Sequence, residues 1–253
     1  MLNYQSIINE FKKLMSLSKN HLKLITSLRQ KKYRQKHKLF VVEGVKVVRE
    51  FLNSSYELDS LFSSSDDFND IPSAIEINDR ELKKISSLKT PNKVLAIFKI
   101  PAKKEVNPKG LIVVLDAIND PGNLGTIIRL CDWYGISDIV CSKDTVDAYN
   151  EKVVQASMGS LTRVGLSYVD LEEFLGTTNM PTFIADMEGD NVYNTQLPKE
   201  GVLVMGNEAN GVSEVVKSLV NNKISIPRFG NIQQTESLNV ATATAILLSE
   251  FRR

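Results

Sequence analysis

The sequence predicts an α/β fold with two domains, a basic first domain over residues 1–100 and a second domain over residues 111–253. In the second domain, short uninterrupted apolar runs alternate with helical segments, which is the pattern of a parallel sheet buried on both faces. Residues 101–110 hold two prolines and three lysines without hydrophobic periodicity, so we expect a linker there. A chain of 253 residues is long enough for two domains.

The first domain alternates helical and strand patterns. Leu22, Ile25 and Leu28 form a helical stripe, and Gly44 precedes a second helical segment. Helices are therefore predicted around residues 22–28 and over residues 45–52 and 80–88, and strands over residues 38–42, 58–62, 74–77 and 94–100. These elements indicate a compact α/β domain of about 100 residues.

The second domain has apolar strands that alternate with helices. The predicted strands are residues 111–115, 138–141, 183–185, 201–205 and 224–226, and the predicted helices are residues 124–134, 151–160, 171–175, 213–220 and 238–253. In parallel sheets of this kind, ligands bind at the carboxyl ends of the strands. The polar motifs of this chain follow those ends.

Several classes of protein are disfavoured by composition. Cys131 and Cys141 lack CxxC spacing, and His21 and His37 lie far from both in the sequence, so neither a disulfide framework nor a metal site is expected. No apolar run reaches the roughly 18 residues of a membrane span, and the first ten residues lack the apolar core of a secretory signal. We therefore expect a cytoplasmic protein.

The charge is divided unequally between the two halves. Residues 1–110 contain 21 Lys and Arg against 12 Asp and Glu, whereas residues 111–253 contain 10 against 18. The candidate RNA contacts in the first half are Lys19, Lys23, Arg29, Lys31, Lys32 and Arg34, in a stretch without acids from Phe11 to Val42. A single charge run is more typical of a solvated helix face, but the excess over the whole half favours binding to nucleic acid.

The first polar motif follows the strand over residues 111–115. Asn123 is expected to cap the next helix, and Arg129 lies less than two turns further along. Six residues of helix separate them by about 120° around the axis, so both can border one cleft. The alternative is a plain helix cap followed by a surface arginine.

The second motif, GNExxG, spans residues 206–211 directly after a strand. Its spacing resembles a phosphate-binding loop, but Val212 stands where that loop needs lysine, so an NTPase is excluded. The chain also has no GxGxxG dinucleotide fingerprint. What is left is a glycine turn that brings backbone close to a ligand, with Glu208 as a nearby carboxylate, or else a simple strand-to-helix turn.

The third motif begins with Ile226 and Pro227 and ends with Ser237, Leu238, Asn239 and Val240 before the last helix. Its Ser and Asn side chains and free backbone N–H groups gather at a helix start, where proteins commonly hold polar or anionic groups.

Together the three motifs resemble, in order and spacing, the signatures of the SpoU/TrmH family, which are RNA ribose 2′-O-methyltransferases of the SPOUT class. The resemblance covers residues 110–253, including Ala156 to Ser160, which look like the Ser-x-Gly helix end of that family. It implies a C-terminal parallel-sheet domain with a deep trefoil knot, a homodimer formed through that domain, and S-adenosylmethionine as cofactor. The first domain is similar, mainly over residues 18–52, to the small α/β/α substrate-binding domain of the family.

The resemblance also assigns roles to residues. Cofactor contacts are implied, largely through backbone groups, for Gly206, Ile226 and Leu238, with Ala185, Met205 and Ser237 close by. Catalytic roles are implied for Arg129, Asn123, Glu208, Ser237 and Asn239, with Ser237 capping the last helix. The expected reaction is methylation of a ribose 2′-hydroxyl in structured rRNA or tRNA, and no metal is needed for it.

Arg129 corresponds to the proposed general base of the family. Guanidinium stays protonated in proteins, so it is a poor base. Our hypothesis is that Arg129 binds the target phosphate and lowers the barrier electrostatically, with the proton lost late or to that phosphate.

The chain departs from the family pattern in one loop. Pro227 and Ser237 are ten residues apart, where seven are usual, so the loop beside the expected cofactor site is longer. Trp133 and Tyr134, next to Arg129 in sequence, are more typical of dimer or core packing than of base stacking. The alternative function is a non-catalytic RNA-binding protein with a relic dimerisation domain, although such a scaffold would not need polar groups at its strand ends.

Overall fold

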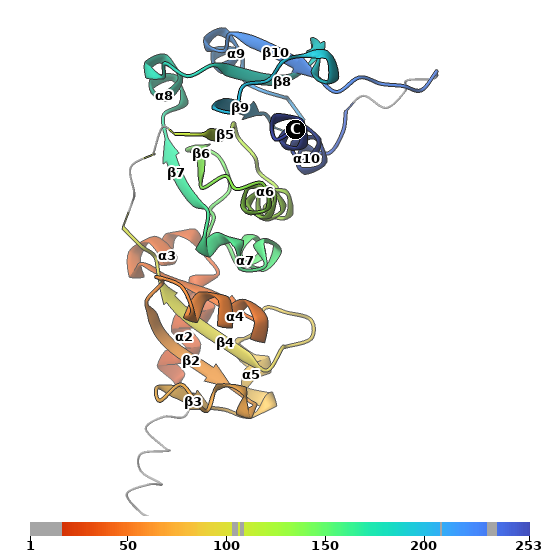
Figure 1. Ribbon diagram of the computed structural model, residues 1–253. Coiled ribbons are helices and arrows are strands. Elements are labelled where there is room, and N and C mark those ends of the chain that lie inside the picture. The colour runs from red at the N-terminus through yellow and green to blue at the C-terminus, as the bar shows by residue number, and fades with distance from the viewer. Residues whose placement is uncertain (1–16, 103–105, 107–108, 208, 232–236) are drawn as a thin grey trace, which may run out of the picture. The chain divides into compact units, whose positions relative to one another are not determined.

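The computed structural model describes residues 17–102, 106, 109–207, 209–231 and 237–253 (Figure 1). The chain divides into two compact units. Of the described residues, the first unit contains 17–102 together with a short segment from later in the chain, Tyr149–Gln155, and the second unit contains the others. The sequence prediction had two contiguous domains and did not assign this later segment to the first one.

The first unit contains a mixed sheet with the strand order β1-β4-β2-β3. The strands are β1 (Leu39–Glu43), β2 (Leu58–Ser63), β3 (Ala74–Glu76) and β4 (Val94–Lys99). β4 runs antiparallel to both β1 and β2, whereas β3 runs parallel to β2. Each of these strands lies within a residue or two of its predicted range, because the apolar runs that define them are bounded by polar residues.

Helices cover both faces of this sheet. Alternate residues of a strand point to opposite faces, so Val41 and Phe40 enter different cores. On one face, Val41 packs with Ile25 of α2 (Lys19–Leu28) and Leu82 of α5 (Asp79–Ile85). On the other, the ring of Phe40 contacts that of Phe51 in α4 (Val45–Leu52), with centroids 5.6 Å apart. A further helix that the sequence did not predict, α3 (Lys31–His37), follows α2.

The segment Tyr149–Gln155 joins the second of these cores. The ring of Tyr149 lies 4.7 Å from that of Phe40, and its hydroxyl is 3.4 Å from the hydroxyl of Tyr56. Glu151, the first residue of α7 (Glu151–Ser157), has a carboxylate oxygen 4.0 Å from Nε of Arg29. Apolar and charged contacts therefore both hold the segment in the first unit.

The second unit is built on a sheet with the strand order β10-β8-β9-β5-β6-β7. Its strands are β5 (Leu111–Leu115), β6 (Asp138–Ser142), β7 (Gly165–Val169), β8 (Thr182–Asn191), β9 (Gly201–Met205) and β10 (Asn222–Ser225). Each neighbouring pair runs parallel, which confirms the predicted parallel sheet. β7 and the second half of β8 were not predicted, because their residues form no continuous apolar run and are only partly buried or exposed.

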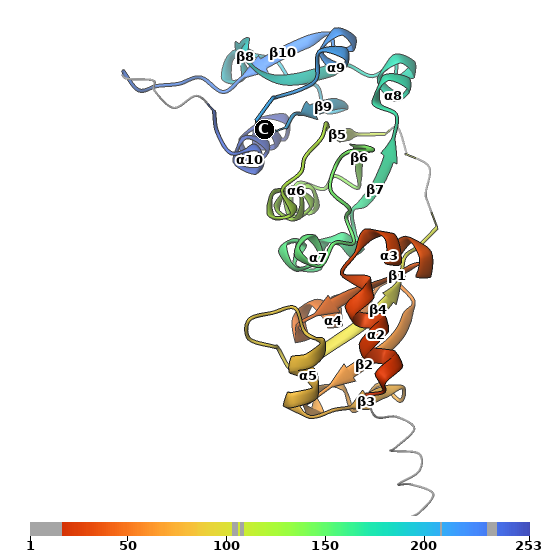
Figure 2. The same ribbon diagram turned by 180° about the vertical axis from the view of Figure 1, so that it is seen from behind.

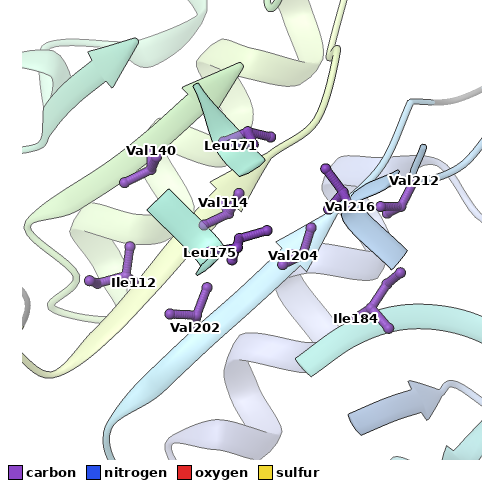
Figure 3. Close-up of a cluster of buried hydrophobic side chains, with 10 residues drawn as sticks. All are labelled: Ile112, Val114, Val140, Leu171, Leu175, Ile184, Val202, Val204, Val212 and Val216. Atoms are coloured by element: carbon purple, nitrogen blue, oxygen red, sulfur yellow. The ribbon is translucent and has the colours of Figure 1, made fainter. Parts of the chain in front are cut away.

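Helices cover the two faces of this sheet as well. Figure 3 shows one core, in which Leu171 and Leu175 of α8 (Leu171–Thr177) and Val212 and Val216 around α9 (Glu214–Leu219) pack on sheet residues. The sheet contributes Ile112, Val114, Val140, Ile184, Val202 and Val204. The remaining helices, α6 (Pro121–Trp133) and α10 (Val240–Phe251), lie side by side in both views (Figures 1 and 2). In the described part of the chain, no helix is long and apolar enough to cross a bilayer.

Candidate active site

The predicted site residues of the second unit lie mainly at the carboxyl edge of its sheet. Leu115 pairs with Met205, so β5 and β9 end at the same level, beside β8, which continues to Asn191. Asp116 and Gly206 follow these two ends, and Ala185 is the β8 residue after Ile184, which pairs with Val204. The first and second motifs therefore leave the sheet side by side, as expected for a ligand site in a parallel sheet.

The first motif forms the start of α6, but its cap differs from the prediction. The N-cap is Asp120, whose Oδ1 accepts a hydrogen bond of 2.8 Å from the backbone N–H of Asn123. Pro121 follows at the first helical position, where its missing N–H costs nothing. Asn123 was wrongly expected to be the cap, because it lies in the first turn of the helix. Arg129 lies on the exposed side of α6.

The third motif meets the first through an amide pair. Nδ2 of Asn239 donates a hydrogen bond of 2.9 Å to Oδ1 of Asn123. Oδ1 of the same Asn239 accepts from the backbone N–H groups of Ala241 and Thr242, so Asn239 is the N-cap of α10. The prediction that Ser237 caps this helix is wrong, since Ser237 is exposed two residues before the cap.

The second motif closes into a tight loop. The backbone groups of Asn207 and Gly211 form two hydrogen bonds with each other, both of 2.8 Å. A Cβ on Gly206 would lie 2.3 Å from backbone atoms of Gly211 and Val212, so only glycine fits there. Glu208, the predicted carboxylate of this loop, lies outside the described residues.

Two further side chains connect the loops of the first and second motifs. Nδ2 of Asn207 donates a hydrogen bond of 2.7 Å to the carbonyl oxygen of Ala117. The backbone N–H of Ser213 donates to Oδ2 of Asp116, which is only 7% exposed, at 2.8 Å. The sequence prediction missed both roles. The signal was present, because Asp116 and Asn207 each come within two residues of a strand end.

The predicted cofactor residues are divided between two places. Met205 and Gly206 lie at the carboxyl end of β9 with Ala185 at the same level on β8, whereas Ile226 lines a cavity of about 310 Å³ after β10. The rest of the lining is Met187, Ser225, Pro227 and Arg228. Leu238 is 49% exposed in the segment before α10 and, among the described residues, does not line this cavity.

These surroundings fit a nucleoside cofactor. The cavity volume lies at the lower end of the range of about 300–1,000 Å³ for ligand sites. Its lining combines apolar Ile226 and Pro227 and the thioether of Met187 with polar Ser225 and Arg228. Such a mixture suits a ligand that has a heterocycle and hydroxyl groups.

A second cavity of about 230 Å³ opens at the carboxyl ends of β5, β6 and β7. Its polar lining includes Asp116, Ser142, Lys143, Asp144, Asp170, Glu172 and Ser213. Lys143 forms an ion pair of 3.1 Å with Asp170 at its rim. No sequence motif predicted this cavity.

The basic residues of the first unit differ in exposure. Lys19, Lys23, Lys31 and Lys32 are exposed. Arg29 is also exposed, but its Nη2 donates to the carbonyl oxygens of Ile85 and Ser86. Arg34 is only 2% exposed, and its Nη1 donates to the carbonyl oxygens of Leu28 and Arg29 at 2.8 and 2.9 Å.

Arg34 was predicted to contact RNA, but its side chain lies in the protein interior. The helix break between α2 and α3 leaves carbonyl groups without helical partners there, and the guanidinium satisfies two of them. The charge pattern alone could not separate this arginine from its exposed neighbours.

Trp133 is 84% exposed at the end of α6, so it does not pack in a core. Both cysteines are buried, and burial raises the pKa of the Cys131 and Cys141 thiols well above their usual range. Within the ranges that the structure describes, no three His, Cys, Asp or Glu side chains come together in a way that could hold a metal ion.

Comparison with known proteins identifies the family. A model of the SpoU rRNA methylase family matches residues 110–249, more than half of the chain. The chain belongs to this family. A second model, the MRM3-like substrate binding domain, matches residues 19–96 of this SpoU chain. The resemblance of the three motifs is thereby confirmed.

Known relatives of this SpoU chain resemble it over nearly its full length. The 23S rRNA (guanosine(2553)-2′-O)-methyltransferase RlmP of Bacillus subtilis (strain 168) is 29% identical, over 95% of this chain and 99% of that protein. A TrmH-family protein from Porphyromonas gingivalis superposes with a TM-score of 0.86 at 36% identity, covering 93% of this chain and 98% of that one. An S-adenosylmethionine-bound rRNA methyltransferase from Sinorhizobium meliloti superposes with a TM-score of 0.83 at 28% identity, covering 94% and 95%.

Proposed function

We propose that this protein transfers a methyl group from S-adenosylmethionine to a ribose 2′-hydroxyl in ribosomal RNA. The observation that carries the proposal is the amide pair between Asn123 and Asn239, which brings the first and third motifs of a SpoU chain together at the start of α6. The relatives named above as rRNA methyltransferases support the choice of ribosomal RNA.

The reaction forms a carbon–oxygen bond as the carbon–sulfur bond of the donor breaks. The donor would supply an electrophilic methyl group and leave as a neutral thioether, and the 2′-hydroxyl loses its proton late in the reaction or to the target phosphate. No redox partner is needed. The protein therefore has to align the hydroxyl with the methyl group and stabilise the charge that changes at the oxygen.

The residues around the start of α6 supply these functions. Arg129 binds the target phosphate and stabilises negative charge near the hydroxyl, because its guanidinium remains protonated. Asn123, fixed by Asn239, orients the nucleotide beside it. Glu208 and Ser237 complete the polar surroundings, and Gly206, Ile226 and Leu238 hold the cofactor mainly through backbone groups, with Ala185 and Met205 nearby.

The first unit binds RNA through its exposed lysines. Lys19 and Lys23 lie on α2 and Lys31 and Lys32 begin α3, where they can contact phosphates. Arg29 contributes from the end of α2, while Arg34 supports the fold. The match of this unit to the MRM3-like substrate binding domain supports the assignment.

The proposal includes a homodimer and the trefoil knot implied by the family. Trp133 is 84% exposed at the end of α6, and an exposed tryptophan beside apolar helices is a common feature of a protein interface. Sedimentation equilibrium of the wild type and Trp133→Arg tests the dimer: the wild type should sediment as a dimer and the variant as a monomer. If both proteins sedimented with the same mass, Trp133 would not be part of a dimer interface.

The deciding experiment combines cofactor binding with mapping of the product. Isothermal calorimetry should detect S-adenosylmethionine binding by the purified protein, and mass spectrometry of rRNA from cells lacking the gene should miss one 2′-O-methyl mark. The purified Arg129→Lys variant should still bind the cofactor. Its gene should not restore the 2′-O-methyl mark in the deletion cells, because lysine cannot reproduce the planar two-point phosphate contact. Binding of RNA without cofactor binding would instead support the relic scaffold.

A further inference from the structure

We propose that Asn207 is a positioning residue, which holds the loop after β5 in the conformation from which α6 presents Asn123 and Arg129. The inference rests on the proposed function and deepens it. It concerns a residue of the second motif that acts on the geometry of the first.

The Asn207 side chain uses both ends of its amide. Nδ2 donates a hydrogen bond of 2.7 Å to the carbonyl oxygen of Ala117, which lies 90 residues earlier in the chain. Oδ1 accepts from the backbone N–H groups of Ala209 and Asn210 at 2.9 and 3.2 Å. The accepting end therefore shapes its own loop, and the donating end reaches the neighbouring one.

The residue that Asn207 contacts has an unusual backbone conformation. Ala117 has φ of 55°, in the left-handed region, which a residue with a Cβ rarely adopts. Its N–H donates to Oγ of Ser142 at 2.9 Å, and its carbonyl oxygen accepts from Asn207. Ala117 is thus held from both sides, by the ends of β6 and β9, in a conformation that its own sequence does not favour.

Ala117 lies just before the start of α6. Asp120, the N-cap of α6, comes three residues after Ala117, and Asn123 lies in the first helical turn. The same loop is tied at Asp116 by the backbone N–H of Ser213. Two hydrogen bonds, from Asn207 and Ser213, therefore join the segment after β9 to the loop that leads from β5 into α6, and loss of one changes their relative positions.

The expected effect follows from how sensitive catalysis is to geometry. A displacement of about 1 Å at reacting groups can cost about 100-fold in rate. Asn207→Asp keeps the acceptor oxygen but loses the donor and places a carboxylate against the Ala117 carbonyl. We expect kcat to fall about 10- to 100-fold, with KM for RNA changed less than about threefold.

A matched variant separates positioning from general stability. Nδ2 of Asn222 also donates to a backbone carbonyl, that of Thr182 at 3.0 Å, but at the start of β8 and β10 and therefore at the amino edge of the sheet. Asn222→Asp loses the same kind of bond. It should lower the melting temperature by a similar amount and leave kcat unchanged.

The test measures kcat, KM for RNA and melting temperature for the wild type, Asn207→Asp and Asn222→Asp. A fall in kcat confined to Asn207→Asp supports the proposal, and an unchanged kcat or an equal fall in both variants overturns it. Hydrogen exchange of the amides in residues 117–120 gives a readout that needs no activity. Faster exchange in Asn207→Asp supports the proposal that Asn207 stabilises the conformation of Ala117, and unchanged exchange overturns it. This readout stands even if the wild type methylates no RNA and the proposed function fails.

Discussion

The amide of Asn239 donates a hydrogen bond of 2.9 Å to the amide oxygen of Asn123, 116 residues earlier in the chain. Each partner is held by its own helix. Asn239 accepts two backbone N–H groups as the cap of α10, and the backbone of Asn123 is fixed by Asp120 in the first turn of α6. The pair therefore joins two helix starts, and its geometry depends on both caps.

Two substitutions at Asn239 should separate the cap from the amide pair. Asn239→Ser keeps a capping oxygen but cannot reach Asn123, whereas Asn239→Ala loses both interactions. We expect Asn239→Ala to lose about 1–2 kcal/mol of stability in urea unfolding and Asn239→Ser to lose less than half of that. Methylation should fall in both. Full activity of Asn239→Ser would show that the amide pair is not needed.

Gly206→Ala should disrupt the second motif. The added Cβ would lie 2.3 Å from backbone atoms of Gly211 and Val212, which cannot move aside as a flexible side chain could. We expect a loss of about 1–3 kcal/mol in urea unfolding, together with weaker S-adenosylmethionine binding by calorimetry.

Gly176→Ala is the control for that change. Gly176 lies in α8, and outside its own stretch of helix no described residue has a heavy atom within 4 Å of the position of its added Cβ. Alanine should therefore stabilise the helix by about 0.5–1 kcal/mol and leave cofactor binding unaltered. If both glycine substitutions had the same effect, crowding at Gly206 would not be the cause.

Arg34 and Lys31 should respond differently to substitution by alanine. Arg34→Ala leaves two backbone carbonyls without their buried donor and should cost about 2–4 kcal/mol in urea unfolding. Lys31→Ala should change stability by less than about 0.5 kcal/mol, but weaken RNA binding and reduce its salt dependence by about one phosphate contact. Filter binding across a salt series measures the second effect. A weakened RNA affinity in a stable Arg34→Ala protein would contradict the structural role.

Glu151 should make stability depend on pH. Burial raises the pKa of this carboxyl, and the hydrogen bond from Ser87 and the charge of Arg29 offset only part of the rise. Because the folded protein holds the proton more tightly than the unfolded chain, this group stabilises the fold as pH falls through its raised pKa and loses that contribution as pH rises.

The measurement compares the melting temperatures of the wild type and Glu151→Gln between pH 4 and pH 8. The neutral glutamine avoids the cost of burying a charge. The melting temperature of the variant should therefore rise relative to that of the wild type as pH rises, and this difference should disappear near pH 4. The opposite trend would mean that the ion pair with Arg29 dominates over burial.

Local sequence patterns predicted most of the strands and helices. β5 and β9 are buried on both faces, so their residues form continuous apolar runs, and α4 begins and ends at its predicted residues. Such patterns depend on neighbours within one element, which the sequence records directly. The three motifs and the family also follow from the sequence, because their spacing is a property of the chain alone.

The helix starts were harder to predict. Both Asp120 and Asn123 are good caps, and the chain could begin α6 at either; Pro121 at the first helical position decides for Asp120. In the third motif, Asn239 rather than Ser237 is the cap, since only its amide also reaches Asn123.

By itself, then, the sequence determined the parallel sheet, the order of the three motifs and the family. The tertiary structure decided which side chains meet: Asn239 with Asn123, Asn207 with Ala117, and Tyr149 with Phe40. It also placed Arg34 inside the first unit, although the lysines around it are exposed. The physical reason is that periodicity records only which face of an element is buried, whereas a hydrogen bond between distant residues requires that folding bring a donor and an acceptor within about 3 Å.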